Sequence, residues 1–336
     1  MSRGSAPVAD VAGQRQTGAV LLIVVLALGA ALLYGVADFM SGVAARRIPV
    51  VVATTINYAF ATVVLMIVVL TVGGVWSSPA IVSGVVAGLL AAVGFLTFTA
   101  ALAAGPISLM TPLIALLSSA VPVVVALVLG DRLEPIAWIA IVVAIIGSVL
   151  IGLERRVSAR AAKPRTLVFA VISGLGLGFA TVALDAAPAD AGMVAIFLDT
   201  TAGLVLLLGI AGLARAVPVM RRAVAVLDAH LAEPAPHLAD TPAPGAARLG
   251  AGIRAADPRR RARRLAGAAG LLIGGANVLL MLALHAGSVA VVAVLVNLYP
   301  VATVLLAWVL LRERVNAVQA TGIVLAVTAS VMLGMA

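Results

Sequence analysis

Long runs of apolar residues, separated by short polar stretches, recur along the whole chain. Each run is close to the ~20 residues that a helix needs to cross the hydrocarbon core of a bilayer. We expect the first run to be a retained helix and not a secretory signal, because the residues before it are only weakly basic and many apolar runs follow. The pattern predicts an all-α integral membrane protein with ten transmembrane helices, over residues 18–37, 50–72, 81–103, 107–129, 136–153, 166–184, 191–213, 265–284, 288–311 and 315–335.

The second half of the chain repeats the first. Gly287–Arg314 runs from a glycine turn through a long apolar helix to an acid–arginine pair, and Gly105–Arg132 does the same. The two stretches align without a gap at an offset of 182 residues, the separation of their first glycines. An internal repeat determines the architecture and is therefore considered first. The same offset matches further residues: Gly88 with Gly270, and Gly152 with Gly334.

The repeat predicts two halves of opposite orientation. Because each half has an odd number of helices, five, the second copy must enter the membrane upside down relative to the first. Inverted repeats are typical of transporters that expose one midplane site to each side in turn. Some channels share this symmetry, so a channel or scaffold without a carrier cycle remains the alternative. The predicted organisation is a polar tail (1–17), a first repeat (18–154), a basic linker (155–165) and a second repeat (166–336).

Composition excludes a soluble protein. Of the 336 residues, 63% are hydrophobic and 10% are charged, whereas soluble domains are about half apolar and a quarter charged. The net charge of +9 would suggest nucleic acid as a partner in a soluble protein. Here the arginines lie between apolar runs, so we expect membrane lipid and no nucleic acid. The chain has no Cys, which excludes disulfides and Cys-based metal sites.

The basic residues predict an orientation. Of the 22 Lys and Arg residues, all except Arg3, Arg15 and Arg132 follow the first, fifth, seventh or ninth apolar run. The positive-inside rule then places both termini outside the cell membrane. Residues 214–264, rich in Ala, Pro and Arg, are expected to form a disordered cytoplasmic loop. Its basic end would attract anionic lipid.

Few polar side chains interrupt the apolar runs, and these are the candidates for chemistry. Asp199 lies about eight residues inside its run, where a charged carboxylate facing lipid is costly. It must therefore face the interior, find a partner or be protonated; binding of a proton or cation and a hydrogen-bonded neutral acid are both open. The candidates for substrate or proton binding are Asp199, Asn57, Asp38, Tyr34, Asn277, Asn297 and Tyr299.

Spacing supports several of these candidates. Asn57 corresponds to Asp199 at an offset of 142 residues, so the two would lie at equivalent depths. Asp38 follows Tyr34 by one helical turn and lies on the same face of the helix. There it could line the mouth of a substrate site or pair with Arg46. The two other asparagines and Tyr299 could bind a substrate or bridge helices.

Glycine and proline predict how the helices pack. Gly84 and Gly88, Gly174 and Gly178, and Gly270 and Gly274 are each spaced by four residues, which lets neighbouring backbones approach closely. Three prolines inside the apolar runs are expected to bend their helices, namely Pro112, Pro122 and Pro300.

The doubled pattern resembles the EamA-type drug/metabolite transporter superfamily. The resemblance rests on Tyr34–Phe39 (YGVADF) before a twin arginine, on Leu298–Pro300 (LYP) and on Arg312–Arg314 (RER). It implies a ten-helix bundle in the cell membrane that moves small metabolites, amino acids or drugs, often outward. It also implies cytoplasmic termini, against the orientation that the charges predict. A zwitterionic or weakly polar metabolite, or a lipophilic cation neutralised by Asp199, would suit the sparse charges.

Signatures of enzymes and of ATP-driven transport are missing from the sequence. There is no HExxH, GxSxG or Walker motif. We therefore expect no enzyme, cofactor, metal or catalytic residue, while an intramembrane enzyme using Asp199 and His285 is an alternative. The expected partners are a small-molecule substrate, lipid and a second copy of the chain.

Overall fold

All regular elements that the computed structural model describes are helices. It describes residues 8–128, 135–152, 164–232, 257–286, 292, 295–296, 298–311 and 317–333. The helices are α1 (Val8–Ala45), α2 (Val50–Val72), α3 (Ser78–Ala104), α4 (Ile107–Val128), α5 (Pro135–Gly152), α6 (Pro164–Asp185), α7 (Val194–Ala216), α8 (Pro218–Leu227), α10 (Pro258–Ala286), α12 (Tyr299–Leu311) and α13 (Ala317–Leu333), with short 3₁₀ turns η1 (Ala189–Ala191) and η2 (Ala229–Ala232).

Six of the described helices are long and apolar enough to cross a membrane. They are residues 21–45 of α1 together with α2, α3, α6, α7 and α10. Their outer faces carry large apolar side chains, such as Leu70 and Val63, which are 76% and 56% exposed. A helix that is apolar on its outer face as well suits a lipid surrounding. The prediction of an all-helical membrane protein is confirmed, while the count of ten crossings stays a prediction.

The boundaries of several helices differ from those predicted. α1 continues to Ala45, so that Asp38 lies within the helix and not near its end. The loop prediction for residues 214–264 is wrong at both ends, because α8 follows α7 and the basic run 259–264 forms the first turns of α10. Pro300 lies in the first turn of α12, where a missing N–H costs no hydrogen bond. The acid–arginine pairs of the repeat lie outside the described residues, as does most of the linker.

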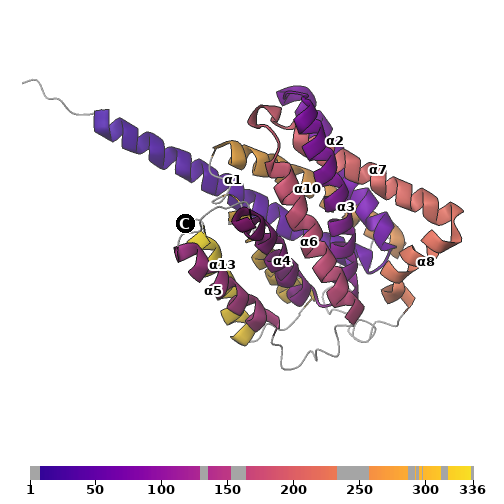
Figure 1. The fold of residues 1–336 in the computed structure, drawn as a ribbon. Coiled ribbons are helices and arrows are strands. Elements are labelled where there is room, and N and C mark those ends of the chain that lie inside the picture. The colour runs from indigo at the N-terminus through magenta and orange to yellow at the C-terminus, as the bar shows by residue number, and fades with distance from the viewer. Residues whose placement is uncertain are drawn as a thin grey trace, which may run out of the picture.

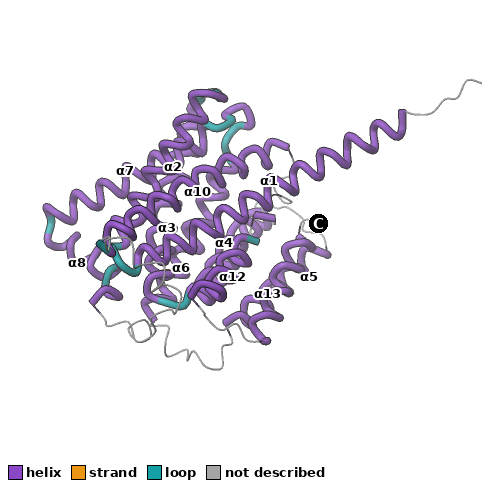
Figure 2. Tube along the Cα trace, turned by 180° about the vertical axis from the view of Figure 1, so that it is seen from behind, coloured by secondary structure: helices purple, strands orange, loops and turns teal. Residues whose placement is uncertain are grey.

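The helices of the two halves are interleaved in one bundle (Figures 1 and 2). α3 packs on α6 and α7, whereas α1 packs on α10 and α12. α5 and α13 pack on each other beside the bundle (Figure 1). The N-terminal part of α1 projects beyond the other helices.

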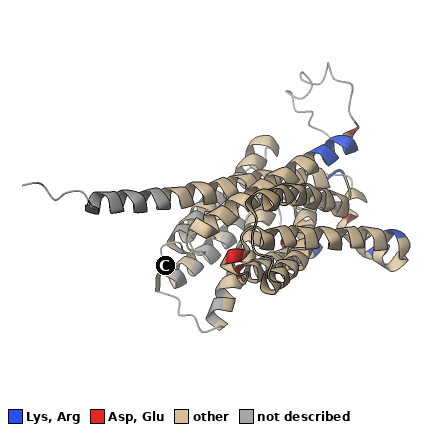
Figure 3. Ribbon diagram, turned by 90° about the horizontal axis from the view of Figure 1, so that it is seen from above, with Lys and Arg blue, Asp and Glu red and all other residues tan. Residues whose placement is uncertain are grey.

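The basic residues of the described chain lie toward one end of this bundle (Figure 3). The Arg46 guanidinium donates hydrogen bonds to the carbonyls of Leu102 and Gly105 at the end of α3, at 3.5 and 3.2 Å. At the same end, an Asp228 carboxylate oxygen after α8 accepts from the backbone N–H of Val50 at 2.7 Å. The start of α2 is thereby joined to a segment of the second half.

Candidate substrate site

A cavity of about 240 Å³ lies between the halves. Helices α1, α2, α3, α4, α6, α7, α10 and α12 all contribute to its wall. Much of the wall is apolar, and a small set of polar side chains interrupts it, as in sites that bind small organic molecules. The polar lining residues are Tyr34, Asp38, Asn57, Tyr58, Ser118, Thr181, Asp199, Thr200, Asn277 and Tyr299.

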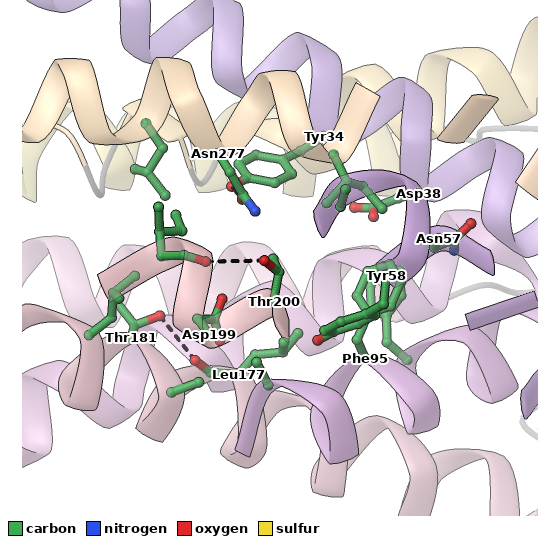
Figure 4. A pocket seen from close by; sticks show the side chains of 18 of the residues that line it. Tyr34, Asp38, Asn57, Tyr58, Phe95, Leu177, Thr181, Asp199, Thr200 and Asn277 are labelled. Atoms are coloured by element: carbon green, nitrogen blue, oxygen red, sulfur yellow. Dashed lines mark hydrogen bonds between the residues drawn. The ribbon is translucent and has the colours of Figure 1, made fainter. Parts of the chain in front are cut away.

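Two carboxylates face this cavity from different helices. Asp38 projects from α1 and is 5% exposed, and Asp199 projects from α7 on the facing wall (Figure 4). Among the described residues that line the cavity, none is Lys, Arg or His. This lining therefore contains two acidic groups and no basic side chain.

Hydrogen bonds within the wall orient the amide side chains. The Tyr34 hydroxyl donates to Oδ1 of Asn277, which joins α1 to α10. Asn57 is fully buried and its Nδ2 donates to the Ser41 hydroxyl at 2.8 Å. The Oδ1 atoms of Asn57 and Asp199 are buried and receive no hydrogen bond from the described protein. Buried acceptors are normally satisfied, so two unpaired ones on residues that line a cavity suggest that a bound molecule supplies the missing donors.

Hydroxyl groups of the wall are turned toward their own helices. Thr200 donates to the carbonyl of Ile196 at 3.3 Å, and Thr181 donates to that of Leu177 at 3.0 Å (Figure 4). Ser118 donates to the carbonyl of Ala115 at 3.0 Å. These three hydroxyl protons are thus already engaged within the protein.

Aromatic rings form one side of the cavity. Tyr58 meets Phe95 edge to face, with ring centroids 6.0 Å apart, and Phe95 stacks on Phe98 at 5.4 Å. The chain has only three tyrosines, and all three line the cavity. Such rings offer π faces and hydroxyls to a bound molecule.

Glycines bring the backbones next to two site residues into direct contact. A Cβ added at Gly88 of α3 would collide with the backbone of Asp199 on α7. A Cβ added at Gly270 of α10 would collide in the same way with the backbone of Asn57 on α2. The close packing predicted from the glycine spacing is found at both places, and it fixes the depth of both site residues.

The structure brings six of the seven predicted site residues to this one cavity. Asp199, Asn57, Asp38, Tyr34, Asn277 and Tyr299 all line it, whereas Asn297 lies outside the described residues. His285 is exposed at the end of α10 and is not among the lining residues, so the arrangement proposed for an intramembrane enzyme is not found. Sequence reasoning missed Tyr58 and Phe95, although Tyr58 follows Asn57 directly.

Comparisons with known proteins agree with this architecture. The model of the EamA-like transporter family matches residues 21–153 and 250–335. A solved structure described only as "Crystal structure of protein" is 18% identical, with a TM-score of 0.53, and the match covers 93% of this chain and 97% of that one. At this identity the likeness concerns the fold alone. No curated protein matches the sequence.

Proposed function

Because the chain belongs to the EamA-like transporter family, we propose that it is a secondary transporter that carries a small organic molecule by alternating access. The observation that carries the proposal is a cavity in which buried polar groups from both halves meet between apolar helices. Transporters of this kind hold their substrate near the midplane, between the repeats. We place the protein in the cell membrane and its transport in the outward direction.

The proposal includes two inverted repeats of five helices, 18–154 and 166–336. An offset of 182 residues relates α3 to α10, and one of 142 relates α2 to α7. Under these relations the contact of Gly88 with Asp199 corresponds to that of Gly270 with Asn57. A pseudo-two-fold axis that exchanges the halves accounts for both contacts.

The packing of whole helices supports the same axis. In the proposed order, α6, α7, α10, α12 and α13 repeat α1 to α5. The pairs α3–α6 and α10–α1 then correspond, as do α3–α7 and α10–α2. The pairs α2–α7, α4–α12 and α5–α13 each correspond to themselves. Ten crossings, five in each half, are the simplest arrangement that yields these pairs.

Contacts between loops follow the same relation. The turn between α2 and α3 is bonded to the segment between α6 and α7, since the Val75 N–H donates to the Asp190 carbonyl at 3.1 Å. Correspondingly, the segment after α7 is bonded to the start of α2 through Asp228 and Val50. Among the described residues, each end of the bundle thus has a hydrogen bond that joins the two halves.

The residues that line the cavity have distinct roles in the proposed transport. The apolar wall excludes water from the bound molecule, and the tyrosines and amides orient it. Asp38 and Asp199 carry compensating charge and can hold a proton when no cation is present, because an uncompensated charge at this depth is costly. Exchange of a proton for substrate at these carboxylates would couple transport to the proton gradient.

The test is counterflow in proteoliposomes that contain the purified protein. Vesicles are preloaded with unlabelled amino acids or cationic dyes, and uptake of the labelled compound is followed. A carrier gives saturable uptake that the internal compound accelerates. Ala61→Trp, which fills the cavity from α2, should abolish this uptake, whereas Val63→Trp on the outer face of the same helix should not. Flux that the internal compound does not accelerate would indicate a channel. Equal flux in both variants would show that the substrate does not pass through this cavity.

A further inference from the structure

The cavity offers hydrogen-bond acceptors in excess of donors. Oδ1 of Asp199 and Oδ1 of Asn57 are buried acceptors that receive no hydrogen bond from the described protein. The donors beside them are largely engaged, since Nδ2 of Asn57 bonds to Ser41 and the Thr200 hydroxyl bonds to its own helix. The donors that remain for a ligand are neutral: the amide of Asn277 and the hydroxyls of Tyr58 and Tyr299. A bound molecule must therefore donate hydrogen bonds to satisfy this site.

Charge points to the same class of molecule. Asp38 and Asp199 both line the cavity, and the described lining contains no basic side chain. A substrate carboxylate would lie near like charges with no positive group to receive it, which is strongly unfavourable in a desolvated site. A protonated amino group has the opposite effect, because it compensates a carboxylate and donates up to three hydrogen bonds.

The aromatic wall is compatible with a cation as well. Rings of Tyr58 and Phe95 lie in the same cavity as the two carboxylates (Figure 4). The faces of aromatic rings attract ammonium groups, and their edges and the surrounding leucines accept a hydrocarbon chain. The cavity therefore combines charge compensation with an apolar surface for the remainder of the molecule.

We infer that the substrate is an organic amine, bound as its ammonium form, and that the cavity excludes the corresponding carboxylate-bearing amino acid. This inference rests on the proposed transport function and names the substrate class of the same site. Asp199 compensates the ammonium and accepts one of its N–H bonds. Asn57 accepts from a further donor of the substrate. Asp38 compensates a second ammonium in a diamine, or carries a proton when the amine is singly charged.

Matched pairs that differ by one carboxylate test the inference directly. The pairs are phenethylamine and phenylalanine, isoamylamine and leucine, and cadaverine and lysine. Binding of each labelled compound to the detergent-purified full-length protein is measured by equilibrium dialysis, since neutral amines also cross lipid unaided and would obscure a flux assay. We expect each amine to bind at least about 100-fold more tightly than its amino acid, because of the like-charge contact described above.

Variants identify the groups responsible. Asp199→Asn should weaken amine binding by at least about tenfold, because it removes a charge-assisted hydrogen bond. Asp190→Asn, the same change at an exposed residue of η1, is the matched control and should bind as the native protein does. The double variant Asn57→Asp/Asp199→Asn moves the carboxylate to the corresponding position of the other half. It should recover part of the lost affinity, which separates a loss of charge from a loss of folding.

The outcomes separate the two proposals. Amino acids that bind as tightly as their amines, or amines that bind equally well to Asp199→Asn, would overturn the inference. Binding of no amine in the panel would overturn it too. Tight amine binding without carrier counterflow of any compound would support the inference and contradict alternating access. Carrier counterflow of amino acids without amine binding would leave the transporter intact and remove its assigned substrate class.

Discussion

The contact between Gly88 and the backbone of Asp199 makes a sharp prediction about stability. A Cβ at position 88 would lie 2.8 Å from the carbonyl carbon of Asp199 and 2.9 Å from its Cα, and closer still to its oxygen. These are backbone atoms, which cannot rotate away as a side-chain end can. Gly88→Ala therefore forces α3 and α7 apart at the depth of the site.

The expected loss follows from two opposing effects. Overpacking of a close contact costs about 1–3 kcal/mol, and rigid neighbours place this contact at the upper end. Replacing glycine by alanine within a helix recovers about 1 kcal/mol. We therefore expect Gly88→Ala to lower the free energy of unfolding by about 2 kcal/mol. Gly270→Ala, which meets the backbone of Asn57, should cost a similar amount.

Unfolding in mixed micelles by titration with SDS, followed by tryptophan fluorescence, measures the change. Gly209→Ala is the matched control, because that glycine is exposed on α7 and a Cβ there has no atom within 4 Å. The control should be unchanged or more stable by up to about 1 kcal/mol. If Gly88→Ala proves as stable as Gly209→Ala, the helices are not held by this contact and the argument from glycine packing is wrong.

Three further predictions concern other parts of the molecule. Asp228→Ala should lower the free energy of unfolding by about 1 kcal/mol, because the N–H at the start of α2 loses its acceptor; Asp228→Asn, which keeps an acceptor oxygen, should lose less in the same SDS titration. Tyr34→Phe leaves the amide oxygen of Asn277 without its donor and should lower the free energy of unfolding by about 1 kcal/mol, and an unchanged midpoint would contradict this bond. In the orientation that the basic residues predict, Arg222→Cys of this Cys-free chain should react with an impermeant maleimide only from the cytoplasm and Asp190→Cys only from outside; the reverse pattern would contradict that orientation, and labelling of both from one side would contradict a membrane crossing by α7.

The length of the apolar runs predicted the helices well, because every helix that crosses the bilayer must span the same thickness and be apolar where it meets lipid. The run over 50–72 coincides with α2 residue for residue. α8 was missed because its ten residues are too few to span a bilayer and its arginines resemble those of a loop. The first turns of α10 were missed for the same reason, since a helix that leaves the membrane continues through a basic sequence.

The candidate site was predictable wherever a polar residue interrupted an apolar run. Asp199 and Asn57 were identified by their depth and by the repeat, and both line the cavity. Phe95 and Leu177 gave no such signal, because an apolar residue facing a cavity and one facing lipid obey the same preference. Which face of α3 and α6 turns inward is decided by packing against distant helices, and that information is not local.

The interleaving of the halves has a consequence for how the protein is made. α1 packs on α10 and α12, and α5 packs on α13, so helices that leave the ribosome early find their neighbours among those that leave it last. Gly88 of α3 likewise has no partner until α7, with Asp199, has been made. The two halves therefore cannot assemble one after the other during translation. A chain interrupted before α13 would leave α5 without the helix on which it packs, and we expect such a chain to be degraded.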